Sequence, residues 1–169
     1  MKAISETDGD ALAWFKTTGR TWWRRLLFGS DWELVSGNER VATLQFEAPR
    51  RAVAEATDGR WRLHYRDKWT GISFIARVEG SHFGEMADYK GAGESLFKLS
   101  DGRQFRWNAE GGYGSDCTFA SEDSGELIRF SGYRVDLAPE AFPRPETSLL
   151  VCFGEFLKMI RDNELRRSV

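Results

Sequence analysis

The chain has 169 residues, a formal net charge of −2 and 30% charged residues. This length suits one domain with a sizeable core, and the slightly acidic balance excludes a general attraction to nucleic acid. Aromatic residues make up 14% of the chain, a content that excludes disorder over most of its length.

The first residues are polar and acidic, and they lack the apolar core of a secretory signal. We interpret residues 1–13 as a loose leader and residues 14–169 as a single domain. No window contains the roughly 20 apolar residues that a membrane-spanning helix needs. We therefore expect a cytoplasmic protein.

Aromatic and basic residues are mixed after the leader, between residues 14 and 28. This cluster has three interpretations: it closes one end of the folded core, it binds anionic lipid headgroups, or it binds a protein partner. Indoles suit a membrane interface and guanidinium groups suit lipid phosphates. The candidate ligand-binding residues are Arg20, Trp22, Trp23, Arg24, Arg25, Arg50 and Arg51. Three further arginines, Arg60, Arg62 and Arg66, extend the cationic face.

Strand signals then dominate residues 32–137. A hairpin is predicted where residues 32–35 and 41–46 flank a Ser-Gly-Asn turn. Residues 60–66 alternate most clearly, with Trp61, Leu63 and Tyr65 on one face and basic residues on the other. Ten to twelve short strands fit between residues 32 and 137, a spacing typical of an antiparallel sandwich or barrel.

A faint internal repeat links two of these strands. Residues 57–60 (Thr-Asp-Gly-Arg) recur as residues 100–103 (Ser-Asp-Gly-Arg), each before a basic and aromatic strand. Residues 61–63 superpose on residues 105–107 only if one residue is inserted after the turn, because side-chain facing has a period of two.

A helix is predicted over about residues 146–165, opened by proline and hydroxyl residues and followed by arginines. Its middle is apolar on nearly every side, interrupted only by Gly154, Glu155 and Lys158. A helix of this kind must be enclosed on every side, and residues 149–160 are too few to cross a bilayer. The expected core residues are Leu149, Leu150, Val151, Phe153, Phe156, Leu157 and Ile160.

With its predicted strands and helix in this order along the sequence, the chain resembles the superfamily that joins the tubby C-terminal domain, the LURP-one-related proteins and the phospholipid scramblases. The resemblance rests on the paired Asp-Gly-Arg turns, the many short strands, and residues 147–160 with their charged tail, and it covers about residues 32–167. It implies a mainly β fold: a roughly twelve-stranded antiparallel closed barrel around a buried apolar C-terminal helix. Tubby domains bind phosphoinositides, but the cysteine-rich and calcium-binding segments of scramblases are absent here.

Residues for catalysis or metal binding are scarce. His64 and His82 are the only histidines and Cys117 and Cys152 the only cysteines, so no zinc-ligand set forms. Gly112-Tyr113-Gly114-Ser115 lacks the following helix of a nucleophile elbow, and residues 90–94 lack the Lys-Ser/Thr pair of a phosphate-binding loop. The sequence therefore favours a non-enzymatic protein without metal or cofactor.

The leading hypothesis is a barrel that binds anionic phospholipid headgroups, or a membrane surface, on its outer wall. The central helix would fill the interior and leave no room for a ligand there. The alternative is a structural or protein-interaction module, self-associating or bound to a protein partner. No nucleic-acid partner is expected.

Overall fold

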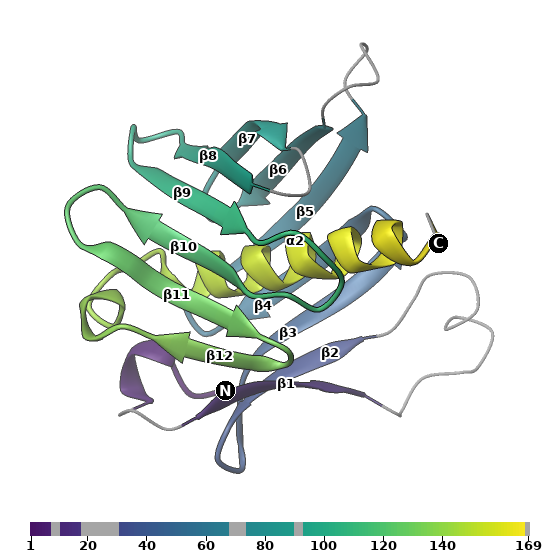
Figure 1. The fold of residues 1–169 in the computed structure, drawn as a ribbon. Coiled ribbons are helices and arrows are strands. Elements are labelled where there is room, and N and C mark those ends of the chain that lie inside the picture. The colour runs from purple at the N-terminus through teal and green to yellow at the C-terminus, as the bar shows by residue number, and fades with distance from the viewer. Residues whose placement is uncertain (8–10, 18–30, 68–73, 90–92, 168–169) are drawn as a thin grey trace.

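The computed structural model describes residues 1–7, 11–17, 31–67, 74–89 and 93–167. Within them, twelve antiparallel strands form one closed barrel in the order β1-β12-β11-β10-β9-β8-β7-β6-β5-β4-β3-β2 (Figure 1). The strands are β1 (Leu12–Lys16), β2 (Trp32–Ser36), β3 (Glu39–Ala48), β4 (Arg51–Ala56), β5 (Gly59–Asp67), β6 (Phe74–Gly80), β7 (Gly84–Tyr89), β8 (Gly93–Leu99), β9 (Gln104–Ala109), β10 (Cys117–Ser121), β11 (Gly125–Ser131) and β12 (Arg134–Leu137).

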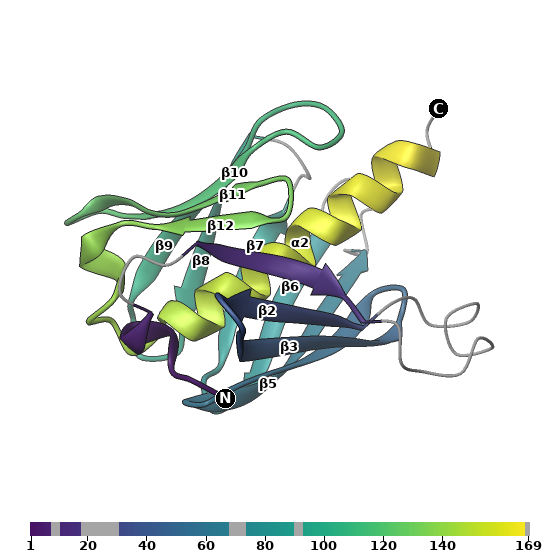
Figure 2. The ribbon, with the colours of Figure 1, turned by 90° about the horizontal axis from the view of Figure 1, so that it is seen from below.

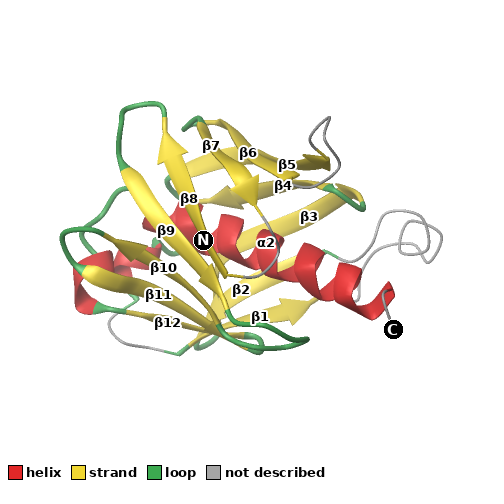
Figure 3. Ribbon diagram, turned by 45° about the horizontal axis from the view of Figure 1, so that its top comes forward, coloured by secondary structure: helices red, strands yellow, loops and turns green. Residues whose placement is uncertain are grey.

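A single long helix, α2 (Thr147–Arg167), runs through the barrel formed by the described strands. Figures 2 and 3 show strands on several sides of α2, with its last turns leading out at one end. The predicted core residues Leu149, Phe153 and Leu157 have no exposed surface, and Ile160 is 3% exposed. The predicted mainly β fold, closed around an apolar C-terminal helix, is confirmed.

Side-chain alternation in the strands places aromatic residues against α2. Trp61, Leu63 and Tyr65 of β5 are buried, and so are Phe105 and Trp107 of β9. These inward positions follow the Asp of their turns by three residues in β5 and by four in β9. The predicted one-residue insertion is therefore confirmed, because it keeps the aromatic faces of both strands turned inward.

The N-terminal segment differs from the expected loose leader. Ile4, in the short 3-10 helix η1 (Ile4–Glu6), is only 1% exposed, and β1 already begins at Leu12. Strand β1 closes the barrel: Leu12 pairs with Val135 of β12, and Lys16 pairs with Trp32 of β2. A five-residue strand carries little periodic signal by itself, so its role depends on partners distant in sequence.

Polar contacts fix the beginning of α2. Glu146, one residue before the helix, is 1% exposed and forms an ion pair with Arg103. Arg144 lies 3.7 Å from the other carboxylate oxygen. Arg103 belongs to the second Asp-Gly-Arg turn and also pairs with Asp101 at 2.6 Å. This turn therefore anchors the helix start to the strand wall. A second 3-10 helix, η2 (Pro139–Ala141), leads into this region.

At Gly154, α2 packs closely against the barrel wall. A Cβ atom there would lie 2.2 Å from Cζ of Phe130 and 3.1 Å from Cε2 of Phe119. Both rings are fully buried and have little room to move. We expect Gly154→Ala to lower the free energy of unfolding by about 1–3 kcal/mol, despite the higher helix propensity of alanine.

Urea denaturation of Gly154→Ala measures this effect, with Gly111→Ala as its control. A Cβ at Gly111, in an exposed loop, would meet no atom within 4 Å. The control should change the unfolding free energy by less than about 0.5 kcal/mol. Equal stability of the two variants would contradict the close contact.

Candidate functional site

The outer faces of β4 and β5 carry a group of basic side chains, here called the basic wall. It consists of Arg51 on β4 and of Arg62, His64 and Arg66 on β5. The three arginines are exposed and His64 is half-buried. Arg51 lies directly opposite His64 in the β4–β5 register, and Arg62 and Arg66 are two residues from His64 along the strand. The antiparallel ladder therefore brings the four side chains to one face.

The arginines of the basic wall have neither an ion pair nor a side-chain hydrogen bond among the described residues. Several arginines elsewhere on the barrel surface are paired with acids. Arg77 binds Glu85 at 2.5 Å, Arg129 binds Glu126 at 2.9 Å, and Arg134 binds Asp136 at 3.2 Å. The exposed Arg60 and Arg106 also have no ion pair among the described residues. The basic wall is distinguished by bringing three such guanidinium groups, open to an external anion, to one face of two paired strands.

Two neighbours shape the basic wall further. Val53 of β4 lies opposite Arg62 and is only 8% exposed although it faces outward, so surrounding side chains cover it. Glu79 of β6 also lies opposite Arg62, and its carboxylate is 3.9 Å from Nε2 of His64. Glu79 therefore limits the positive charge around His64 and Arg62. Guanidinium groups in such an arrangement suit phosphate or carboxylate anions.

Arg50 does not belong to the basic wall, although it precedes Arg51 in the sequence. Its guanidinium lies 3.3 Å from Glu164 near the end of α2 and 5.4 Å from the ring centre of Tyr65. The Tyr65 hydroxyl donates a hydrogen bond to the same carboxylate at 3.1 Å. Burial, with the negative charge of Glu164, raises the pKa of Tyr65 above its ordinary value. Arg50 thus helps to attach the helix to the barrel rim.

The other predicted ligand residues lie outside the part of the chain that the structure describes. These are Arg20, Trp22, Trp23, Arg24 and Arg25. Their proposed role in binding anionic headgroups or a protein partner stays a prediction.

Charged side chains inside the barrel are a feature that the sequence did not reveal. Glu155 and Lys158, which read as polar interruptions of an apolar helix, are 1% and 4% exposed. Lys158 Nζ donates a hydrogen bond to the Gly132 carbonyl at 2.6 Å and lies 5.8 Å from the ring centre of Tyr133. Its distance to Oε1 of Glu155 is 3.9 Å. The only signal in the sequence was their position inside the segment predicted to be enclosed.

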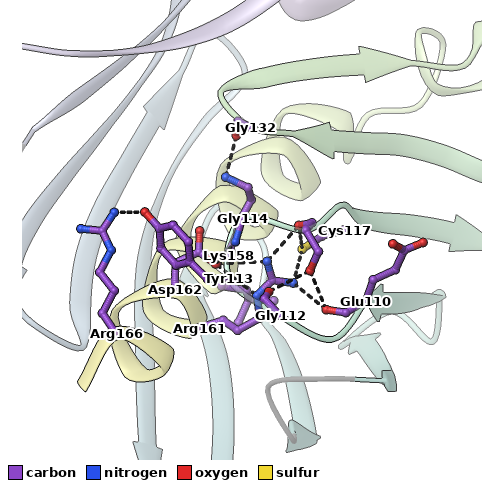
Figure 4. Close-up of polar contacts among 12 residues, drawn as sticks. Glu110, Gly112, Tyr113, Gly114, Cys117, Gly132, Lys158, Arg161, Asp162 and Arg166 are labelled. Carbon is purple, nitrogen blue, oxygen red and sulfur yellow. Dashed lines mark hydrogen bonds and ion pairs between the residues drawn. The ribbon is translucent and has the colours of Figure 1, made fainter. Parts of the chain in front are cut away.

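Arg161, one helical turn further, holds the loop between β9 and β10 (Figure 4). Its guanidinium donates to the carbonyls of Ser115 at 2.9 Å and Glu110 at 3.4 Å, and it lies 2.9 Å from Sγ of Cys117. Asp162 accepts a further bond at 3.1 Å. The close-up shows these groups converging on Arg161 from loop and helix. Carbonyl acceptors satisfy this buried cation, which indicates a structural role in positioning the loop.

The two thiols are poor candidates for nucleophilic chemistry. Cys117 and Cys152 are both buried and free. Burial raises the pKa of the Cys117 thiol to about 11, more than the nearby Arg161 lowers it. Burial likewise raises the pKa of Cys152 above its ordinary value. Thiols in this state are protonated at neutral pH and unreactive. Among the described residues, no group of three or more His, Cys, Asp or Glu side chains is placed to hold a metal ion.

These observations define the chain as a closed antiparallel β-barrel with an internal helix and a basic wall on the outside. Searches of protein-family models, of curated proteins and of solved structures found no match. None of the helices in the described ranges is long and apolar enough to cross a membrane.

Proposed function

We propose that this protein binds anionic phospholipid headgroups on the outside of its barrel, through the basic wall of Arg51, Arg62, His64 and Arg66. The observation that carries the proposal is the gathering, on one face of β4 and β5, of three arginines without an acidic partner among the described residues, whereas Arg77, Arg129 and Arg134 are paired with acids. Phosphate groups would supply the missing acceptors, since guanidinium groups bind phosphate with two parallel hydrogen bonds.

The position of the site on the outer wall has a physical reason. Side chains of α2 fill the barrel, and Phe153 and Leu157 at its middle have no exposed surface. An external face accommodates a headgroup without displacing the core. The free thiols Cys117 and Cys152 suit a reducing compartment, and we propose a cytoplasmic location, where the adjoining membrane leaflet is anionic.

The arrangement of strands closed around a C-terminal helix also supports a proposal about ancestry. It is the fold that the resemblance to the tubby-like, LURP-one-related and scramblase superfamily implies. We propose membership in that superfamily on this ground, with headgroup binding through residues particular to this chain.

We expect the double variant Arg62→Ala plus Arg66→Ala to lose affinity for anionic vesicles by about tenfold or more. Each arginine near an anionic surface contributes about 1 kcal/mol to binding. The measurement is flotation with phosphatidylcholine vesicles that carry phosphatidylserine or a phosphatidylinositol phosphate, at low and high salt. Wild-type binding should weaken as salt rises, because the attraction is electrostatic.

The matched control is Arg129→Ala plus Arg134→Ala, which removes the same charge from arginines that are already paired on β11 and β12. It should bind vesicles as the wild type does. Equal losses in both double variants would show a response to net charge alone and would reject the basic wall as a site. No vesicle binding by the wild type at low salt would favour the alternative, a protein-interaction module. Loss of binding only in Arg24→Ala plus Arg25→Ala would place the site elsewhere.

A further inference from the structure

The carboxyl group of Glu155 is buried inside the barrel and has no hydrogen-bond donor among the described residues. Glu155 is 1% exposed, and neither of its carboxyl oxygens has a hydrogen-bond partner among the described residues. Burial raises the pKa of Glu155 to about 7, more than the nearby Lys158 lowers it. A carboxyl in such a place takes up and releases its proton within the physiological pH range.

Lys158 stands between this carboxyl and the barrel rim. Its ammonium group lies 3.9 Å from Oε1 of Glu155 but only 2.6 Å from the carbonyl of Gly132, in the turn between β11 and β12. Figure 4 shows the lysine reaching from α2 to that turn. The next residue, Tyr133, accepts a 2.8 Å hydrogen bond at its carbonyl from the Trp14 amide of β1. The turn therefore joins α2 to the strand that closes the barrel.

Few other ionisable groups act on this pair. From α2 itself come Asp162 and the Cys152 thiol, and from β10 comes the Cys117 thiol. The ring of Tyr133 faces Lys158 from the turn. The buried side chains of β3, β4, β5 and β11, which also pack against α2, add Tyr65, whose hydroxyl is bound to Glu164. Tyr89 of β7 donates its hydroxyl to the Leu157 carbonyl of α2, and the buried Arg161 follows Lys158 by three residues on α2.

We propose that Glu155 is a proton-operated switch that controls, through Lys158, how firmly the β11–β12 turn is held at the barrel rim. With Glu155 protonated, the ammonium group stays on the Gly132 carbonyl, as the structure shows. When Glu155 loses its proton, the buried carboxylate attracts the ammonium group and weakens its bond to the turn. The seam between β12 and β1 then opens more often. This inference does not depend on lipid binding.

Amide hydrogen exchange of the Trp14 amide, which donates to Tyr133, measures the state of the seam. We expect its protection factor in the wild type to fall by about tenfold or more between pH 5.5 and 8.5, the loss expected for one hydrogen bond to a charged group. In Glu155→Gln, which keeps the shape of a neutral carboxyl, the protection factor should stay constant. In Lys158→Met it should be low at every pH, because the cation is absent.

Amides of the β4–β5 hairpin, such as those of Val53 and Arg62, serve as internal controls. These amides report global unfolding, which also becomes easier as Glu155 ionises. Their protection factors should stay well above that of the Trp14 amide at every pH, because the seam opens without unfolding of the barrel. Equal protection factors at the hairpin and at Trp14 at every pH would mean that both exchange only by global unfolding, and would overturn a switch confined to the turn. A constant protection factor for Trp14 in the wild type, or the same fall in Glu155→Gln, would overturn the role of Glu155.

Discussion

Phe153→Asp should abolish folding. The ring of Phe153 has no exposed surface and lies 4.7 Å from the ring centre of Phe97 and 6.3 Å from that of Phe119. Removing a buried phenylalanine costs about 3–5 kcal/mol, and a buried carboxylate without a partner adds several more. Together these costs approach or exceed the roughly 5–15 kcal/mol that stabilises a typical domain. Circular dichroism and urea denaturation should show no cooperative transition.

The same substitution at an exposed phenylalanine is the control. Phe83 lies between β6 and β7 and is 45% exposed. Phe83→Asp should fold with nearly wild-type stability, because its carboxylate stays in water. The milder Phe153→Leu should remain folded but less stable, which separates the effect of charge from that of packing. A cooperatively folded Phe153→Asp protein would contradict a helix enclosed by the barrel.

The second prediction concerns pH and has the opposite sign to ordinary acid denaturation. The pKa of Glu155 is about 7 in the folded protein, against an ordinary value of 4.5. Between these values the folded state binds more protons than the unfolded state, so stability falls as pH rises. The contribution is fully present below about pH 4.5 and is lost by about pH 7, a change of up to about 3 kcal/mol.

Urea denaturation at a series of pH values from 5 to 8 measures this contribution in wild type and in Glu155→Gln. The variant cannot ionise, so its stability relative to the wild type should increase with pH. Glu122→Gln, at an exposed turn position, should keep a constant difference from the wild type. A pH-independent difference between Glu155→Gln and the wild type would contradict the raised pKa.

Other carboxyl groups with shifted pKa values affect the stability of the protein in a separate pH range. Hydrogen bonds from Ser121 and Arg144 lower the pKa of Asp123 to about 2, and Arg103 lowers the pKa of Asp101. Groups with lowered pKa values add stability above their ordinary pKa and lose it as the pH falls. Their effects therefore appear below about pH 4 and do not overlap with that of Glu155.

Most of the secondary structure could be predicted from patterns within single segments. The alternation of β5 is carried by neighbouring residues, because successive side chains of a strand point to opposite faces. The direction of the β9 side chains could also be predicted, since one residue inserted after the second turn keeps the aromatic side chains of β9 on the inner face. Strand β1 could not be predicted, because its five residues from Leu12 form a strand only by pairing with β2 and β12.

The candidate site could be predicted only in part. Arg50 lies in the turn between β3 and β4, whereas Arg51 is the first residue of β4, so the period of two within a strand does not relate their side chains. Arg50 proves to bind Glu164, 114 residues away along the chain, and Arg51 belongs to the basic wall. Which arginines lack an acidic partner depends on contacts between strands and turns that no local pattern contains.

The apolar run of residues 149–160 was enough to establish that something must surround α2, because the burial of an all-apolar helix follows from its composition. The tertiary structure alone decided the state of Glu155 and Lys158 within that run. Whether a charge on a helix meets water, a partner or a backbone carbonyl is set by what packs against it. Here the β11–β12 turn offers Lys158 the Gly132 carbonyl, while both oxygens of Glu155 remain without a donor among the described residues.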